Sequence, residues 1–91
     1  MVGWPHSPMA MLEPRQLRAA RALVGWSREM LADKSGVPRA TIEQFEAGKT
    51  DPKQTTVHKL RRALERVGVV FQDADDEEWG PGVRLKGKRK D

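Results

Sequence analysis

The stretch that most constrains the fold of this chain is residues 25–50, which read GWSREMLADKSGVPRATIEQFEAGKT. Ser27 can cap a helix over 28–35, because its hydroxyl can accept a bond from a free N–H of the first turn. Gly36 stands just beyond that helix, where glycine adopts a left-handed conformation at little cost. A second helix is expected over 39–47. Two short helices joined by three or four residues that include glycine form a helix-turn-helix, whose second helix can enter the major groove of DNA.

Apolar residues at helical spacing predict one further helix on each side of this pair. The first should begin at Pro14, which suits the first turn of a helix, and should end at Gly25. The fourth should begin near Thr55, with Thr55 or a neighbour as its cap, and should end at Gly68. Met30 should face solvent. The residues expected in the apolar core are Leu17, Ala20 and Val24 with Leu23 alongside, then Leu31, Ala32, Val37, Ile42, Phe45, Val57, Leu60, Leu64 and Val67.

The pattern changes after Gly68, and two short β-prone runs follow, VVF at 69–71 and VRL at 83–85. Residues 73–82 between them form an acidic loop with glycine and proline, so the two runs predict a hairpin. Because an isolated two-stranded hairpin is marginal in water, it should pack on the helices or pair with the strands of a second subunit. The predicted fold is therefore mainly α, with four helices and a short C-terminal β-hairpin.

A chain of 91 residues is expected to form one domain with a small core. We predict a disordered N-terminal arm at 1–12 and a helical domain at 13–68. The hairpin at 69–86 is a candidate dimerisation element, and a basic tail follows at 87–91.

Positive charge dominates the helical part of the chain. The whole chain has a formal net charge of +4, and residues 13–67 hold 12 Lys/Arg against 7 Asp/Glu. Residues 73–78 hold five acids and no base, whereas residues 84–91 hold five bases and one acid. A basic helical part favours a polyanionic partner.

Several classes of protein are excluded by what the sequence lacks. The chain has no cysteine, so it can form neither disulfides nor thiolate metal sites, which fits a reducing cytoplasm. Its two histidines, His6 and His58, are far apart, and the acids at 73–78 lack the spacing of a calcium loop, so no metal or cofactor is expected. No nucleophile–base motif or phosphate-binding glycine loop indicates an enzyme. No secretory signal is apparent, and no apolar run approaches the ~20 residues of a transmembrane helix.

Two strings in the central stretch, GWSREMLA and TIEQFEAGKT, stand on either side of the turn glycine Gly36 and resemble the lambda-repressor-like or XRE family of transcriptional regulators. The resemblance covers roughly residues 13–69. The closing GVVF and GPGVRL are similar to small bacterial members with a C-terminal strand pair. Typical members carry a fifth helix there, so this chain departs from the common pattern in the region that often forms the dimer interface. The resemblance implies double-stranded DNA as the partner.

Base recognition is the first role that the resemblance implies for particular residues. The second helix of the motif should present its N-terminal side chains to base edges. Arginine can donate two bonds to guanine, glutamine can both donate to and accept from adenine, and the methyl group of alanine can touch that of thymine. The alternative is that these are ordinary solvated helix residues. The implied base contacts are Arg39, Ala40 and Gln44, with Thr41 and Glu43 at the margin.

Phosphate binding is the second implied role. Ser27 and Arg28 stand at a helix N-terminus, which attracts anions. Lys49, Thr50 and Lys53 should meet the DNA backbone on the far side of the groove. The alternative for the cations is plain surface charge, and Ser27 can act as a cap alone.

Two further positions of the family pattern are structural. Arg21 and Glu46 match an ion pair that ties the first helix to the third, and Trp26 matches a core position. Trp79 lies in the acidic loop and has no core-like spacing. It is either an anchor for a partner or dimer, or a loop residue that covers the hairpin.

The function implied by the resemblance is sequence-specific DNA binding by a cytoplasmic transcriptional regulator, a repressor that binds a pseudo-palindromic operator as a homodimer. One alternative is the antitoxin of a toxin–antitoxin pair that represses its own operon, with the C-terminal half holding the toxin. Another is a domain that binds only protein, against which the retained Arg28, Arg39, Gln44 and Lys49 argue.

Overall fold

The computed structural model describes residues 12–74 and 79–87. Four helices are followed by two antiparallel strands, which confirms the fold class predicted from the sequence. The elements are α1 (Pro14–Val24), α2 (Arg28–Ser35), α3 (Arg39–Glu46), α4 (Gln54–Glu65), β1 (Val69–Gln72) and β2 (Gly82–Leu85). The predicted arm up to residue 11, the acids at 75–78 and the tail from residue 88 lie outside the described residues.

The helix ends follow from local chemistry. The Ser27 hydroxyl accepts a 3.0 Å hydrogen bond from the backbone N–H of Met30 at the start of α2. Gly36, with a φ of 79°, ends α2 in the left-handed conformation that favours glycine. α4 begins just before Thr55, with Lys53 at the cap position and no side-chain cap, so Thr55 lies inside the first turn.

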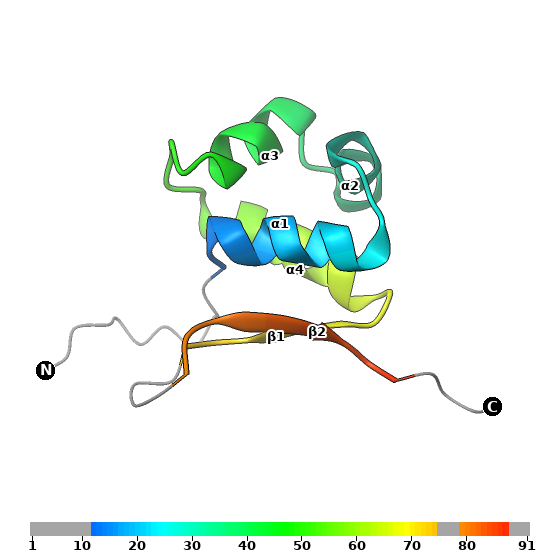
Figure 1. The fold of residues 1–91 in the computed structure, drawn as a ribbon. Coiled ribbons are helices and arrows are strands. Elements are labelled where there is room, and N and C mark those ends of the chain that lie inside the picture. The colour runs from blue at the N-terminus through cyan, green and yellow to red at the C-terminus, as the bar shows by residue number, and fades with distance from the viewer. Residues whose placement is uncertain (1–11, 75–78, 88–91) are drawn as a thin grey trace, which may run out of the picture.

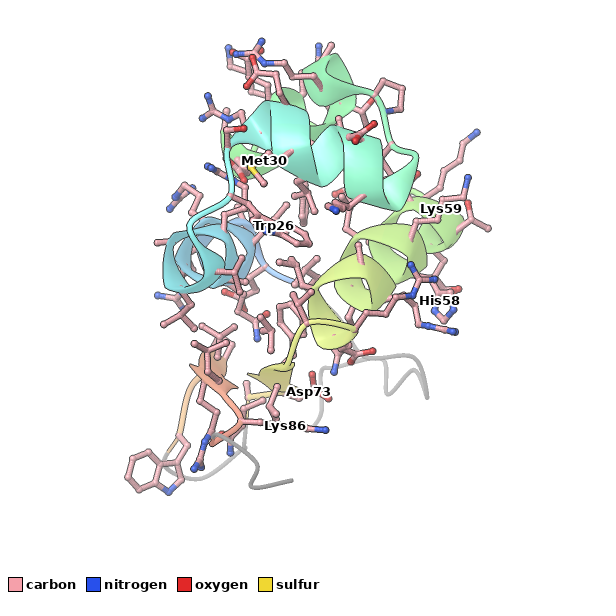
Figure 2. The ribbon with its side chains drawn as sticks, turned by 90° about the vertical axis from the view of Figure 1, so that its right-hand side faces the viewer. Trp26, Met30, His58, Lys59, Asp73 and Lys86 are labelled. Atoms are coloured by element: carbon pink, nitrogen blue, oxygen red, sulfur yellow. The ribbon has the colours of Figure 1, made fainter. Side chains whose placement is uncertain are left out.

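A single apolar core lies between the helices and the inner face of the hairpin. Its buried members are Leu12, Leu17, Ala20, Leu31, Val37, Ile42, Phe45, Leu60, Ala63, Leu64, Val69 and Phe71. The predicted partners Val24, Trp26, Ala32 and Val57 pack against it while partly buried. Figure 2 shows Trp26 among the helices and Met30 on α2, where 43% of Met30 is exposed.

Three positions differ from the sequence prediction. Leu12 was assigned to the arm, but it is buried, because an apolar residue just before α1 can fold back onto the core. Leu23 is 42% exposed, since it lies off the face of α1 that Leu17 and Ala20 bury. Val67 is 49% exposed, because it follows the end of α4, where helical spacing no longer places side chains.

The elements form layers (Figure 1). α2 and α3 lie on one side of α1 and α4, and the hairpin lies on the other. The amide of buried Gln16 in α1 holds the hairpin, because its Nε2 donates to the carbonyl oxygens of Gln72 and Gly82 at 3.2 and 3.1 Å. Phe71 pairs with Val83 on the inner face of the sheet. None of the described helices is long and apolar enough to span a membrane.

Candidate nucleic-acid interface

α3 turns one side to the core and the other to solvent. Ile42 and Phe45 are buried, whereas positions 39, 40, 43 and 44 are exposed and fall within one arc of the helix. Thr41 is half-buried. The exposed side therefore carries four of the five residues predicted to approach base edges, namely Arg39, Ala40, Glu43 and Gln44.

Arg39, at the start of α3, is held by two carboxylates. Its Nε lies 2.9 Å from Oε2 of Glu29 in α2, and its Nη1 lies 3.6 Å from Oε1 of Glu43 one turn further along α3. All three side chains are about half exposed or more, so water screens these contacts. Another hydrogen-bond acceptor can therefore replace the carboxylates at little cost. The contact with Glu29 could not be predicted from the sequence, since it depends on how α2 crosses α3.

A buried carboxylate, Glu46, lies at the other end of α3. Arg21 of α1 donates to it from Nε at 2.7 Å and from Nη2 at 2.8 Å. Arg28 of α2 donates from Nε at 3.0 Å, and Arg18 donates to the backbone oxygen of Glu46. The Glu46 side chain is 1% exposed. This one residue therefore ties three helices together and fixes α3 on the domain.

The charge state of Glu46 follows from these bonds. Burial by itself would raise the pKa of Glu46, but hydrogen bonds from Arg21 and Arg28, together with their charges, outweigh burial and lower it. The same hydrogen bond raises the pKa of Arg21 above its ordinary value. Glu46 is therefore an anion in the folded protein over the whole neutral range.

The residues predicted to contact phosphate lie at two places. Ser27 and Arg28 are at the start of α2, where Arg28 is 34% exposed although its Nε is engaged by Glu46. Lys49, Thr50 and Lys53 are exposed in the turn between α3 and α4. Sequence reasoning offered a phosphate contact or plain surface charge for Arg28 and missed its bond to Glu46. Both roles are compatible, because one Nε–H contact leaves the Nη groups of a guanidinium to donate elsewhere.

No group of three potential metal ligands occurs among residues 12–74 and 79–87. Trp79 is 67% exposed, so most of its surface faces solvent.

Comparison with known proteins agrees with this geometry. The pattern of the helix-turn-helix family HTH_3 matches residues 17–70. An uncharacterized HTH-type transcriptional regulator of Archaeoglobus fulgidus is 38% identical over 66 residues, which cover 71% of this chain and 94% of that protein. Antitoxin HipB of Escherichia coli is 35% identical over 69 residues, which cover 68% of this chain and 73% of that protein.

Proposed function

The chain belongs to the helix-turn-helix family HTH_3, as its resemblance to lambda-repressor-like proteins predicted, and from that premise we propose that it is a repressor that binds a pseudo-palindromic operator as a homodimer. DNA-binding transcriptional regulation, without enzymatic activity, is the function of the family. The observation that carries the proposal is the exposed side of α3, which presents Arg39, Ala40, Glu43 and Gln44. We expect such a regulator to act in the cytoplasm, on the nucleoid when bound to DNA.

In this proposal α3 enters the major groove of each half-site. Arg39 donates to guanine, Gln44 pairs with adenine, and the methyl group of Ala40 touches thymine. Thr41 and Glu43 lie at the margin of the contact. Phosphates are bound by Ser27 and Arg28 on one side of the groove and by Lys49, Thr50 and Lys53 on the other. Bound protein then blocks access to a promoter.

The hairpin is the proposed dimer element. Each strand of a two-stranded sheet has one edge without a partner strand, which a second copy can extend. The hairpin and α3 lie on opposite sides of the α1–α4 layer (Figure 1). Edge-to-edge pairing about an axis perpendicular to the sheet would therefore leave both copies of α3 facing the same side. That arrangement suits half-sites about one helical turn apart, ~34 Å.

Selection of bound sites from a random pool of duplex DNA tests the proposal. We expect an inverted repeat whose half-sites are about one turn apart. Recovery of no common sequence would contradict sequence-specific repression.

A second function is supported by the similarity to antitoxin HipB. In this alternative the chain also neutralises a toxin, and exposed Trp79 beside the acidic segment would bind it, since tryptophan is enriched at interface hot spots. Co-expression with the product of the neighbouring gene tests this. A purified complex that Trp79→Ala disrupts would support it, and two proteins that elute separately would argue against it.

A further inference from the structure

The cations of the helix-turn-helix are largely neutralised by neighbouring acids. Residues 27–53 hold five Lys/Arg and five Asp/Glu, so this segment has no net charge. Within it, Arg28 and Arg39 each contact a carboxylate. The salt-dependent part of DNA affinity grows with the number of phosphates that cations contact, and this segment holds no excess of cations over acids. The excess of Lys/Arg over Asp/Glu in residues 13–67 therefore lies outside residues 27–53.

The larger part of that excess lies in α4 and the residues just after it, because residues 54–67 hold four Lys/Arg and one Asp/Glu. Lys59, Arg62 and Arg66, the last of which caps the C-terminal end of α4, are all exposed. Their spacing places them along one side of the helix, away from buried Leu60 and Leu64. Figure 2 shows Lys59 on the outer side of α4, away from Trp26 in the core. None of the three has a carboxylate within 4.0 Å among the described residues, whereas Arg61 on the same helix contacts Glu65 and Asp73.

This row of cations continues from the turn that was predicted to bind phosphate. Lys49 and Lys53 are exposed just before α4, and neither contacts a carboxylate within the described part of the chain. From Lys59 to Arg66 the helix rises about 10 Å. That length matches the axial rise of about three phosphates on one DNA strand.

We propose that Lys59, Arg62 and Arg66, here called the α4 row, form an additional surface for the DNA backbone. The row extends the phosphate contacts of the turn at 49–53 along α4. This inference rests on the proposed function, because it requires the chain to bind duplex DNA. It assigns to α4 a large share of the salt-dependent affinity, and it leaves sequence discrimination to α3.

A matched pair of double variants tests the α4 row. Arg62→Gln with Arg66→Gln removes two of its cations, and Arg84→Gln with Lys86→Gln removes two exposed cations of the hairpin. Both variants change the net charge equally, but the hairpin lies on the far side of the α1–α4 layer from α3. Binding is titrated in salt on a duplex that carries one half of the selected operator, so that dimer formation does not enter.

The expected result is a loss of about two from the slope of log affinity against log salt for the α4 variant, and almost none for the hairpin variant. Arg62→Lys with Arg66→Lys should restore the slope, because it restores the charge. Hydroxyl-radical footprinting should then show lost protection at one backbone segment for the α4 glutamine variant alone. Equal, small changes of the salt slope in both double variants would overturn the proposal. Binding of an acidic protein to the α4 row, with no change in DNA binding by the α4 variant, would also overturn it.

Failure of the proposed function gives a different result. Repeating the titrations on a duplex of unrelated sequence tests the α4 row without any operator. If the wild type selects no common sequence but the α4 variant still loses salt slope, the proposed operator is contradicted. The α4 row is then still supported as a surface for the DNA backbone. A wild-type chain that binds neither duplex would overturn both.

Discussion

Glu46 and Glu29 both contact arginines of the helix-turn-helix, but they differ in burial. The Glu46 side chain is 1% exposed and receives bonds from two arginine side chains. The Glu29 side chain is 68% exposed and, among the described residues, forms an ion pair with Arg39 alone. A buried charge that loses its partner strongly destabilises the folded protein, whereas an exposed charge is solvated by water. A buried arginine–carboxylate pair therefore holds the C-terminal end of α3 on the domain. The exposed pair at the N-terminal end of α3 can be exchanged for another contact, and this is the end where DNA is expected.

The largest effect is expected from removal of the buried carboxylate. Glu46→Ala leaves Arg21 and Arg28 without the group that they share, and should lower the free energy of unfolding by ~3–5 kcal/mol. Urea denaturation followed by circular dichroism measures this. Glu43→Ala is the matched control on α3, because its exposed contact with Arg39 should contribute less than ~1 kcal/mol. Equal losses of unfolding free energy in the two variants would show that burial does not decide how much each carboxylate contributes.

Base discrimination should depend on the exposed end of α3. Arg39→Ala should cost ~1–3 kcal/mol of preference for one guanine, because the bidentate contact is lost. Its free energy of unfolding should change by less than ~0.5 kcal/mol, as is usual for an exposed residue. Competition binding with operators changed at single positions measures the preference. Lys49→Ala is the contrasting variant, since a phosphate contact weakens all sequences alike and lowers the salt slope by about one. An Arg39 variant that also weakens every sequence alike would refute a base contact.

The sequence predicted the parts of this comparison that depend on local spacing. The Ser27 cap and the turn glycine Gly36 located α2 and α3, and helical periodicity located α1 and α4. Ile42 was correctly expected in the core. Helical spacing wrongly placed Val67 in the core, because the apolar repeat of the sequence continues past the residue at which α4 ends. The ion pair of Arg21 with Glu46 came from family resemblance, since the two residues are 25 positions apart and no local rule joins them.

Contacts that depend on tertiary packing were not predictable. The contact of Glu29 with Arg39 and the bond of Arg28 to Glu46 both require the crossing of α2 over α3. The side-chain amide of Gln16 donates to the carbonyl oxygens of Gln72 and Gly82, which are 56 and 66 residues away. These two residues stand where β1 ends and β2 begins. Glutamine in a helix reads as a surface residue from sequence, and only the position of the hairpin makes it a buried link.

Acid should weaken the scaffold through Glu46. Its pKa is lowered by folding, so its contribution to stability is complete above the unfolded pKa and is lost as the pH falls through the folded pKa. The gap in unfolding free energy between the wild type and Glu46→Gln should therefore be widest near neutral pH and shrink below the unfolded value of about 4.3. Urea titrations over this pH range measure the gap. A gap that stays constant as the pH falls would show that the charge of Glu46 is not what the arginines stabilise.

The smallest effect is expected at Glu29, and it tests whether the exposed contact is exchanged for DNA. Glu29→Gln removes a carboxylate that competes with guanine for Arg39, so the affinity for the operator should rise by at most ~1 kcal/mol, about fivefold. The unfolding free energy should hardly change. Glu65→Gln makes the same change of net charge at the end of α4, beside Arg61. A gain at Glu29 that exceeds the gain at Glu65, and that disappears when Arg39→Ala is added, would show that Arg39 leaves Glu29 to bind DNA. Equal gains in the two glutamine variants would mean that only long-range charge had changed, and the contact of Glu29 with Arg39 would then have no part in recognition.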